Sequence, residues 1–258
     1  MADGSITDAE FEQAGLRLAV DGPVATITLA RPERRNALTF STWRTLARIG
    51  DTLPGDVRVV VVRGEGPAFS AGIDLRLFTA EGVPGEDALG PRDEDFIHGL
   101  QAGYLWLRRP EIVSIAAVQG HAIGGGFQLA LACDLRVAAD DVKFAMKEPA
   151  LGIVPDLSGT KPLVDIVGVP RALELCLTAR TVHAEEAARL GLAELVVPAA
   201  ELGKAVDDLV AAILAVRPST AVAVKRLLRE APGNTLEQQA AAERREQVVL
   251  LRELSEPS

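Results

Sequence analysis

The sequence predicts an α/β protein whose final third is mainly helical. Between residues 24 and 138, segments with strand and helix patterns follow one another in the repeated order strand, strand, helix. Beyond Pro155, one helix-favouring segment succeeds another. With 258 residues, the chain is long enough for one large domain with a sizeable core, or for one domain with a helical appendage. Two domains of ordinary size are also compatible with this length.

Two strands are predicted before residue 63. The pattern VATITL at 24–29 alternates apolar residues with threonine, which is typical of a half-buried strand. The valine-rich run at 57–62 predicts a strand that other elements cover on both faces. A turn is expected at 63–66, where the sequence is Arg-Gly-Glu-Gly.

Helices are expected on either side of an acidic, glycine- and proline-rich loop. Residues 36–53 form an amphipathic pattern that Thr39 or Ser41 would begin as N-cap. The loop is predicted at 82–95, at the surface, and the second helix at 96–107.

The most apolar stretch, residues 112–133, has the length of a membrane span. It is interrupted by three polar side chains and a glycine triplet, so a buried strand, a turn and a helix explain it better. These elements are predicted at 112–118 and 127–133, and a further strand at 135–138.

The C-terminal part is predicted as a series of helices, with Ser219 and Thr235 as N-caps for two of them. Their expected ranges are 170–178, 184–190, 202–216, 219–229 and 235–253. We therefore divide the chain into a core at 1–197 and a helical region at 198–258. Residues 1–15 are expected to fray, because they begin acidic and polar.

Charge and composition exclude several functional classes. The net charge of −9 and the pI of about 5.0 disfavour binding to nucleic acid or to an anionic membrane. Residues 1–13 lack the basic patch and apolar run of a signal peptide. Cys133 and Cys176 lie in apolar runs and are interpreted as buried hydrophobic residues, so a cytoplasmic location fits best. The histidines are scattered, and we expect no metal site.

Two turns of small residues carry the strongest chemical signal. The first spans 68–75, with the sequence AFSAGIDL, and the second spans 121–128, with the sequence HAIGGGFQ. Small side chains let a ligand approach the backbone, and a helix start presents free N–H groups with a positive dipole end. Both turns therefore favour an oxyanion or a phosphate. Ser70 is not expected to be a hydrolase nucleophile, because no G-x-S-x-G surrounds it.

These turns, together with residues 35–38 (RNAL) and 148–160, closely resemble the enoyl-CoA hydratase/isomerase (crotonase) family. The resemblance covers about 20–197. It implies a crotonase-like spiral of repeated β-β-α turns with a C-terminal helical trimerisation region, and a homotrimer or a dimer of trimers. It also implies an acyl-CoA substrate, with coenzyme A as part of that substrate and no separate cofactor.

The resemblance also assigns roles to residues of the two turns. The main-chain N–H groups of Ile73 and Gly125 would bind the thioester oxygen. The backbone at Ala68, Ser70 and Ala71 would cradle the adenine end of coenzyme A. The remaining substrate-binding positions of the two turns would be Gly72, Gly124 and Gln128.

The family places carboxylates at up to three stations around the acyl group. The first station is Gln128 here, where typical hydratases have Glu, and the second matches Glu148. The third matches Asp156, where most hydratases have Gly. Glutamine cannot accept a proton, so double-bond isomerisation is favoured over hydration. We expect Glu148 and Asp156 to form a pair with separated pKa values, one of them raised.

Other functions stay open on the sequence alone. The chain could be a catalytically weak acyl-CoA-binding homologue, or it could use the same enolate for hydrolysis, decarboxylation or C–C cleavage. His98 and Gln101 border the acyl pocket in one interpretation, although a solvated helix face is favoured for both. Trp43 and Trp106 are predicted to be core residues.

Overall fold

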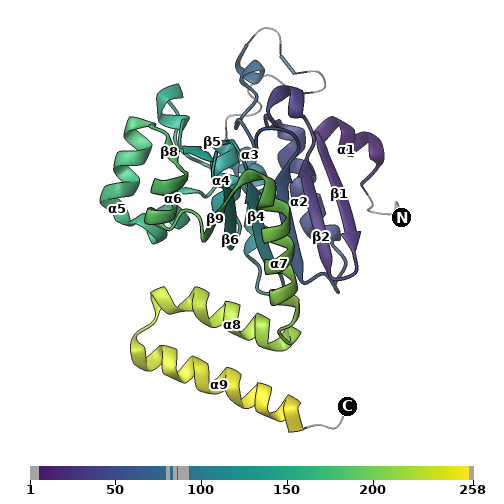
Figure 1. The fold of residues 1–258 in the computed structure, drawn as a ribbon, viewed down its shortest axis with the longest axis vertical. Coiled ribbons are helices and arrows are strands. Elements are labelled where there is room, and N and C mark those ends of the chain that lie inside the picture. Colours follow the sequence, from purple (N-terminus) through teal and green to yellow (C-terminus); the bar gives the residue numbers. More distant parts are fainter. Residues whose placement is uncertain (1–5, 80–81, 84–85, 87–92, 256–258) are drawn as a thin grey trace.

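The computed structural model describes residues 6–79, 82–83, 86 and 93–255. It consists of a body of two sheets and their covering helices, from which a helical hairpin projects (Figure 1). The helices are α1 Asp8–Ala14, α2 Phe40–Thr52, α3 Glu94–Leu105, α4 Gly125–Ala132, α5 Thr160–Thr178, α6 Ala184–Leu190, α7 Leu202–Leu214, α8 Pro218–Glu230 and α9 Leu236–Ser255. Part of the predicted loop 82–95 lies outside the described residues.

The larger sheet has the order β1-β2-β3-β4-β6-β9, in which β1 and β2 are antiparallel and all other neighbours are parallel. Its strands are β1 Leu16–Asp21, β2 Val24–Leu29, β3 Val59–Gly64, β4 Val113–Val118, β6 Leu135–Ala139 and β9 Leu195–Val197. A smaller sheet has the order β5-β7-β8, with strands β5 His121–Ile123, β7 Lys143–Ala145 and β8 Val182–His183. The α/β class predicted from the sequence is confirmed.

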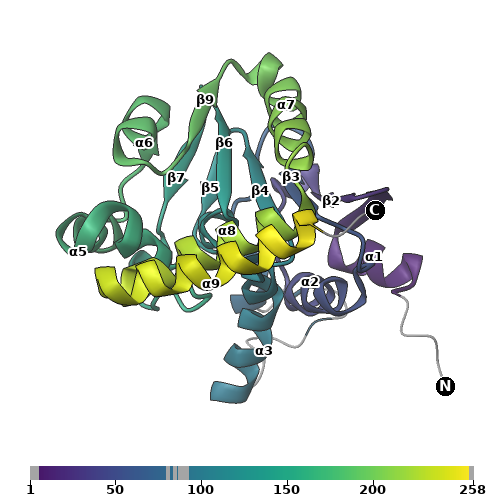
Figure 2. The same cartoon turned by 90° about the horizontal axis from the view of Figure 1, so that it is seen from below.

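Helices cover both faces of the larger sheet, as the valine-rich run predicted. Along β3, Val60 and Val62 belong to the main core, which also holds residues of α2, α3 and α4. Val59 and Val61 belong to a second core with Leu202 and Val206 of α7. Figure 2 shows α7 and α2 on different sides of the strands. Successive side chains of β3 thus face opposite layers, as in any strand that is covered on both faces.

The N-terminal segment corrects one prediction. Residues 1–15 were expected to fray, whereas residues 8–14 form α1; residues 1–5 lie outside the described part. Thr7 and Glu10 form a reciprocal capping box at the start of this helix. Ala14 is fully buried, and its carbonyl accepts a hydrogen bond from the Thr42 hydroxyl of α2. Local capping and packing therefore hold a segment that composition alone marked as polar.

Two predicted helix starts are also corrected. The helix expected from residue 36 begins at Phe40, because Asn36 has a left-handed backbone with φ of 54°. Its N-cap is Thr39, one of the two predicted residues. Helix α5 begins at Thr160 rather than at 170 and is broken at Gly168, where φ is 73°.

The C-terminal helices α8 and α9 form the projecting hairpin (Figure 1). The predicted N-cap Ser219 lies inside α8, which begins at Pro218. Thr235 does cap α9, since its hydroxyl accepts the Gln238 N–H at 3.2 Å. Within the described residues, no helix is both long and apolar enough to cross a membrane. The division of the chain at residue 197 stays a prediction.

Candidate functional site

An apolar cavity of about 540 Å³ lies between α2, α3, the start of α4 and the segment after Glu148. Most of its wall is hydrocarbon and aromatic ring, and its ionisable groups are the carboxyl groups of Glu148 and Asp156. The lining residues are Phe40, Trp43, Ile73, Phe78, Phe96, Ile97, Leu100, Gly125, Glu148, Ile153, Val154, Asp156 and Leu157. The site therefore combines an apolar chamber with two acids, which is typical of a small-molecule site.

The first predicted turn reaches this cavity at Ile73. The Leu38 N–H donates to the Gly72 carbonyl at 2.7 Å, and the Asp74 N–H donates to the Leu38 carbonyl at 2.8 Å. In an extended segment, alternate residues direct their backbone groups to opposite sides. The Ile73 N–H therefore faces away from Leu38, and within the described residues it donates to no protein acceptor.

The second predicted turn brings Gly125 to the cavity. Gly125 is the first residue of α4, and N–H groups in the first turn of a helix have no partner within the helix. The preceding Gly124 has φ of 51° and ψ of −122°, which a side chain would strain. The positive end of the α4 dipole adds to the attraction of the Gly125 N–H for an anion.

The two turns are packed against each other. A Cβ added to Gly72 would lie 2.5 Å from the Ile123 carbonyl oxygen and 3.6 Å from the Gly125 nitrogen. A Cβ added to Gly126 would lie 2.6 Å from the Cβ of Ser70. Glycine is needed at both positions for this approach. Ile73 and Gly125 thus line the same cavity, whereas their roles as donors to one ligand oxygen stay a prediction.

Glu148 begins a short 3-10 helix, Glu148–Leu151, and its carboxyl group lies beside the second turn. A Cβ on Gly124 would meet both carboxylate oxygens at 3.0 to 3.4 Å, so the small residue makes room for this acid. The Glu148 Oε1 atom accepts a hydrogen bond from Gln128 Nε2 at 2.7 Å, whereas Oε2 is buried and has no hydrogen-bond partner in the described ranges. Burial is the main cause that raises the pKa of Glu148, and the nearby Asp156 carboxylate raises it further.

Gln128 is fully buried and uses both ends of its amide group. Its Nε2 donates to Glu148, and its Oε1 accepts from the N–H groups of Leu157 at 2.9 Å and Gly159 at 3.1 Å. The two backbone N–H groups require an acceptor, so the amide oxygen of Gln128 must face them and the amide nitrogen must face Glu148. Gln128 therefore joins Glu148 to the segment that carries Asp156.

Asp156 lies on the same wall as Glu148 and is partly buried. Burial raises the pKa of its carboxyl group. The Asp156 carbonyl accepts a hydrogen bond from Gln101 Nε2 of α3 at 2.6 Å. We expected one of the two acids to have a raised pKa, and the structure raises the pKa of both.

A model of the family described as enoyl-CoA hydratase/isomerase matches residues 20–255. The chain belongs to this family.

Solved structures support the same membership. A candidate enoyl-CoA hydratase of Thermobifida fusca YX, in complex with CoA, is 57% identical with a TM-score of 0.94, over 98% of this chain and 99% of that one. A structure of a candidate hydratase from the same organism, with acetoacetyl-CoA, is 58% identical with a TM-score of 0.93, over 96% and 98%.

Curated relatives carry the names of hydratases and a dehydratase. A probable enoyl-CoA hydratase of Mycobacterium bovis is 35% identical over 70% of this chain and 68% of its own length. A carnitinyl-CoA dehydratase of Escherichia coli is 36% identical over 83% of this chain and 80% of its own length. The crotonase-like α/β fold of the enoyl-CoA hydratase/isomerase family, expected from the two turns, is thereby confirmed.

One functional contact of this family member was missed by the sequence analysis. The hydroxyl of Tyr104, which is completely buried, donates to the Gly125 carbonyl at 2.8 Å. This bond holds the peptide group between Gly125 and Gly126, which directly follows the Gly125 N–H in the chain. Burial raises the pKa of Tyr104, so the hydroxyl stays a donor. Its signal in the sequence was weak: Tyr104 is the chain's only tyrosine and lies near the end of a helix of mixed polarity, outside both turns.

Other predicted residues have mixed outcomes. Ser70 is fully buried, and its Oγ donates to the Asn36 carbonyl at 2.8 Å, so it holds the first turn in place. The proposed contacts of Ala68 and Ala71 with adenine stay predictions. Gln101 is partly buried and donates to the Asp156 carbonyl, whereas His98 is exposed as favoured.

The structure also tests the predictions for core residues. Trp43 is buried as expected and forms part of the cavity wall, and Trp106 packs partly buried against the main core. Cys133 is buried, as expected, and Cys176 is partly buried. Among the described residues, no group of His, Cys, Asp or Glu is placed to hold a metal ion.

Proposed function

We propose that this enzyme binds an acyl-CoA thioester and stabilises its enolate, with the acyl group in the apolar cavity. One observation carries the proposal: two turns, whose Ile73 and Gly125 N–H groups have no acceptor among the described residues, and a buried carboxyl group converge on the same chamber. The CoA and acetoacetyl-CoA complexes of Thermobifida proteins that are 57% and 58% identical support the choice of substrate class.

The Ile73 and Gly125 N–H groups would bind the thioester oxygen. Removing a proton from the carbon next to a thioester places negative charge on this oxygen. Each preorganised donor aimed at that charge lowers the barrier by roughly 3 kcal/mol. The pair would therefore provide a large part of the rate enhancement, and the apolar wall would strengthen their effect by excluding water.

Glu148 would move the proton. In the part of the chain that the structure describes, its Oε2 atom has no hydrogen-bond donor, whereas Oε1 accepts from Gln128, so one oxygen is left to exchange a proton with the substrate. The raised pKa suits this task, because it brings the carboxylate closer to the basicity that general base catalysis needs at neutral pH.

Within this chemistry, we propose double-bond isomerisation rather than hydration. Hydration in the family uses carboxylates at the first two stations to hold one water. Here the first station is an amide with both ends engaged in hydrogen bonds to protein groups. Asp156 supplies a second acid on the same wall, so protons can be removed at one carbon and returned at another.

A panel of 2-enoyl-, 3-enoyl- and 3-hydroxyacyl-CoA substrates tests this proposal, with the products separated by liquid chromatography, which resolves isomers, and identified by mass spectrometry. We expect an isomer of equal mass from the 3-enoyl substrate and little gain of water from the 2-enoyl substrate. A gain of water as the fast reaction would assign a hydratase. Loss of carbon dioxide from a malonyl-type substrate, or release of free acid, would assign another enolate reaction.

A second candidate is an acyl-CoA-binding homologue without significant turnover, favoured by the amide at position 128. Calorimetry combined with the substrate panel separates the two functions. A pure binder would bind the thioesters tightly in the calorimeter and leave every substrate of the panel unchanged.

The variants Glu148→Gln and Asp156→Asn should each reduce isomerisation about 100-fold or more, as expected for loss of a general acid or base. Glu185→Gln and Asp207→Asn serve as matched controls, because both side chains are exposed and lie outside the cavity.

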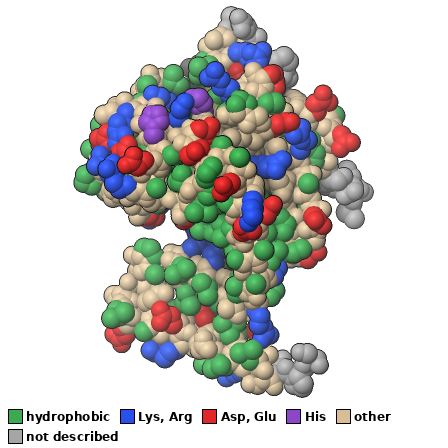
Figure 3. All heavy atoms as spheres, viewed as in Figure 1, with side chains coloured by type: hydrophobic (Ala, Val, Ile, Leu, Met, Phe, Trp, Pro, Cys, Tyr) green, Lys and Arg blue, Asp and Glu red, His purple; other side chains and the backbone are tan. Residues whose placement is uncertain are grey.

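We also propose that the chain forms trimers through its C-terminal hairpin. Helices α8 and α9 project from the body, and large apolar side chains remain exposed on them (Figure 3). Val224 is 47% exposed, Leu228 is 69% exposed and Leu251 is 51% exposed. Exposed apolar surface of this kind marks contact sites. Light scattering coupled to size-exclusion chromatography should give three times the chain mass, or six times for paired trimers; a monomer would contradict the proposal.

A further inference from the structure

We propose that Asp74 is a positioning residue, clasped by Arg31 and Arg76, that keeps the Ile73 N–H aimed at the thioester oxygen. The inference rests on the proposed function, because a positioned N–H matters only if charge develops in front of it. It assigns a role in the chemistry to an ion-pair cluster that lines no part of the cavity.

The Asp74 carboxylate is almost completely buried and binds two arginines. Arg76 donates to it from Nε at 3.0 Å and from Nη2 at 2.7 Å, and Arg31 Nη2 donates at 3.0 Å. The same carboxylate accepts the Arg76 N–H at 3.2 Å and so caps the short 3-10 helix Leu75–Phe78. Hydrogen bonds from Arg76 and then Arg31 lower the pKa of Asp74 to about 2, so it is ionised at any working pH.

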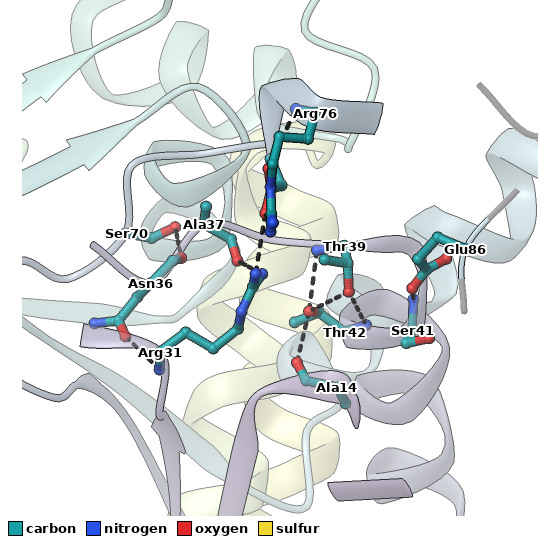
Figure 4. A network of polar contacts seen from close by, with 11 residues as sticks. Ala14, Arg31, Asn36, Ala37, Thr39, Ser41, Thr42, Ser70, Arg76 and Glu86 are labelled. Atoms are coloured by element: carbon teal, nitrogen blue, oxygen red, sulfur yellow. Dashed lines mark hydrogen bonds and ion pairs between the residues drawn. The ribbon is translucent and has the colours of Figure 1, made fainter. Parts of the chain in front are cut away.

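Arg31 connects this carboxylate to the neighbouring segment. Its Nη1 donates to the Ala37 carbonyl at 2.7 Å, so one guanidinium holds both Ala37 and Asp74. Its own N–H is accepted by the Asn36 side chain at 2.9 Å. Figure 4 shows Arg31 extended between Asn36 and Ala37, with Arg76 approaching from the opposite side. The planar guanidinium can satisfy both acceptors at once.

The other end of the turn is tied to the same segment. Ser70 Oγ donates to the Asn36 carbonyl at 2.8 Å and accepts the Gly72 N–H at 3.2 Å. Ile73 thus lies between two attachments, Ser70 on one side and Asp74 on the other, and both lead to residues 36–38. Among the described residues the Ile73 N–H has no acceptor, so these attachments and the adjacent bridge to Leu38 determine its direction.

A role limited to stability would not require this arrangement. Burying a charged group is costly, and apolar side chains of similar size often stabilise a fold as well as a buried ion pair does. Charged hydrogen bonds do fix geometry more strictly than apolar contacts. Because a displacement of about 1 Å can reduce a reaction rate 100-fold, strict geometry is valuable directly beside an oxyanion donor.

The decisive variant is Asp74→Asn, which keeps the shape of the side chain and removes its charge. We expect kcat to fall about 10- to 100-fold while KM changes less than about 3-fold, because the affected N–H acts mainly in the transition state. The second readout is acetoacetyl-CoA, whose enolate absorbs differently from its keto form. The bound enolate fraction should fall in the variant, because the enolate oxygen depends on the same donors.

Asp134→Asn is the matched control. Asp134 is also an ion-paired carboxylate, although only partly buried: its Oδ2 accepts from Lys225 Nζ at 2.6 Å and from the Ser114 N–H at 2.9 Å. It follows the C-terminal end of α4, whereas Gly125 begins that helix. We expect this control to lose thermal stability without losing the enolate absorbance. If Asp74→Asn does not fold, Arg31→Lys replaces it, since lysine cannot hold Ala37 and Asp74 with one planar group.

The outcomes are distinguishable. Wild-type kcat and enolate fraction in folded Asp74→Asn or Arg31→Lys would overturn the inference, as would equal losses in Asp134→Asn. If the wild-type protein itself neither enolises bound acetoacetyl-CoA nor turns over any acyl-CoA, the proposed function fails, and the inference fails with it. A reduced enolate signal confined to the clasp variants supports the assignment.

Discussion

Replacing Gly72 by alanine should separate the two turns at the cavity and slow the reaction about 100-fold. Gly72 has φ of 85°, and a Cβ there would lie 2.5 Å from the Ile123 carbonyl oxygen. Ordinary contact begins at 3.4 Å, so one turn must retreat by about 0.9 Å. The Ile123 oxygen belongs to the backbone, and the added Cβ is fixed directly to the backbone of residue 72. Neither atom can rotate away as the end of a flexible side chain does. A displacement of about 1 Å at reacting groups can cost a factor of 100 in rate.

The same substitution also strains the folded state. A side chain in the left-handed region costs roughly 1–2 kcal/mol, and the contact with Ile123 adds to this. Gly22→Ala is the matched control, because Gly22 also has a positive φ, of 50°, but no atom lies within 4 Å of the added Cβ. It should show the backbone strain alone.

The assay compares kcat on a 3-enoyl-CoA with the free energy of unfolding in urea for both variants. We expect Gly22→Ala to lose stability and keep its kcat, and Gly72→Ala to lose both. A folded Gly72→Ala protein with wild-type kcat would refute the reasoning, because the packing of the two turns would then have no bearing on catalysis. Equal kcat losses in both variants would refute it as well, since strain alone would explain them.

Three further predictions concern charges. The pKa of Glu148 is higher in the folded state than in the unfolded state. At pH values between these two pKa values the folded state binds more protons, so the contribution of Glu148 to stability falls as pH rises through this window. Glu148→Gln should show a smaller fall, because only the raised pKa of Asp156 still contributes to it, and urea unfolding at several pH values measures the difference. Gln128→Glu should place two carboxylates about 2.7 Å apart, where one proton is shared, and should raise the ratio of hydration to isomerisation in the mass-spectrometric assay. Asp134→Ala should cost about 3 kcal/mol or more in the free energy of unfolding, because it leaves Lys225 buried without its counterion.

Regular patterns with strong periodicity were predictable from the sequence. The alternation at 24–29 gave the bounds of β2, and the threonine before α2 is its N-cap. Strand β1 was missed, although Leu16, Leu18 and Val20 are apolar at alternate positions. It is an edge strand whose side chains are mostly exposed, so this alternation marks no fully buried face. Strands β5 and β7 have three residues each, which is too short for a periodic signal.

Part of the site was predictable for a physical reason. Close approach of a backbone to a ligand requires small residues, and these are visible as the two turns in the sequence. The contacts of Gln128 were not predictable, because its backbone partners at Leu157 and Gly159 lie 29 and 31 residues away. The clasp of Arg31 on Asp74, 43 residues apart, was hidden for the same reason. Long-range polar contacts depend on the completed fold and leave no local pattern.

The register of two buried strands links the packing of the cores to the positions of the two turns at the cavity. Strands β3 and β4 are parallel neighbours, with Val62 opposite Ala116, so their carboxyl ends lie at the same edge of the sheet. The Ile73 turn follows β3, and the Gly125 turn follows β4 and β5, which brings both to one place. A slip of one residue would shift one turn by about 3.3 Å along the sheet, beyond the reach of a shared oxygen. It would also reverse the faces of Val60 and Val62, which pack in the main core, so both cores would oppose it. The valine-rich run that buries both faces of β3 therefore also holds the spacing of the two amides.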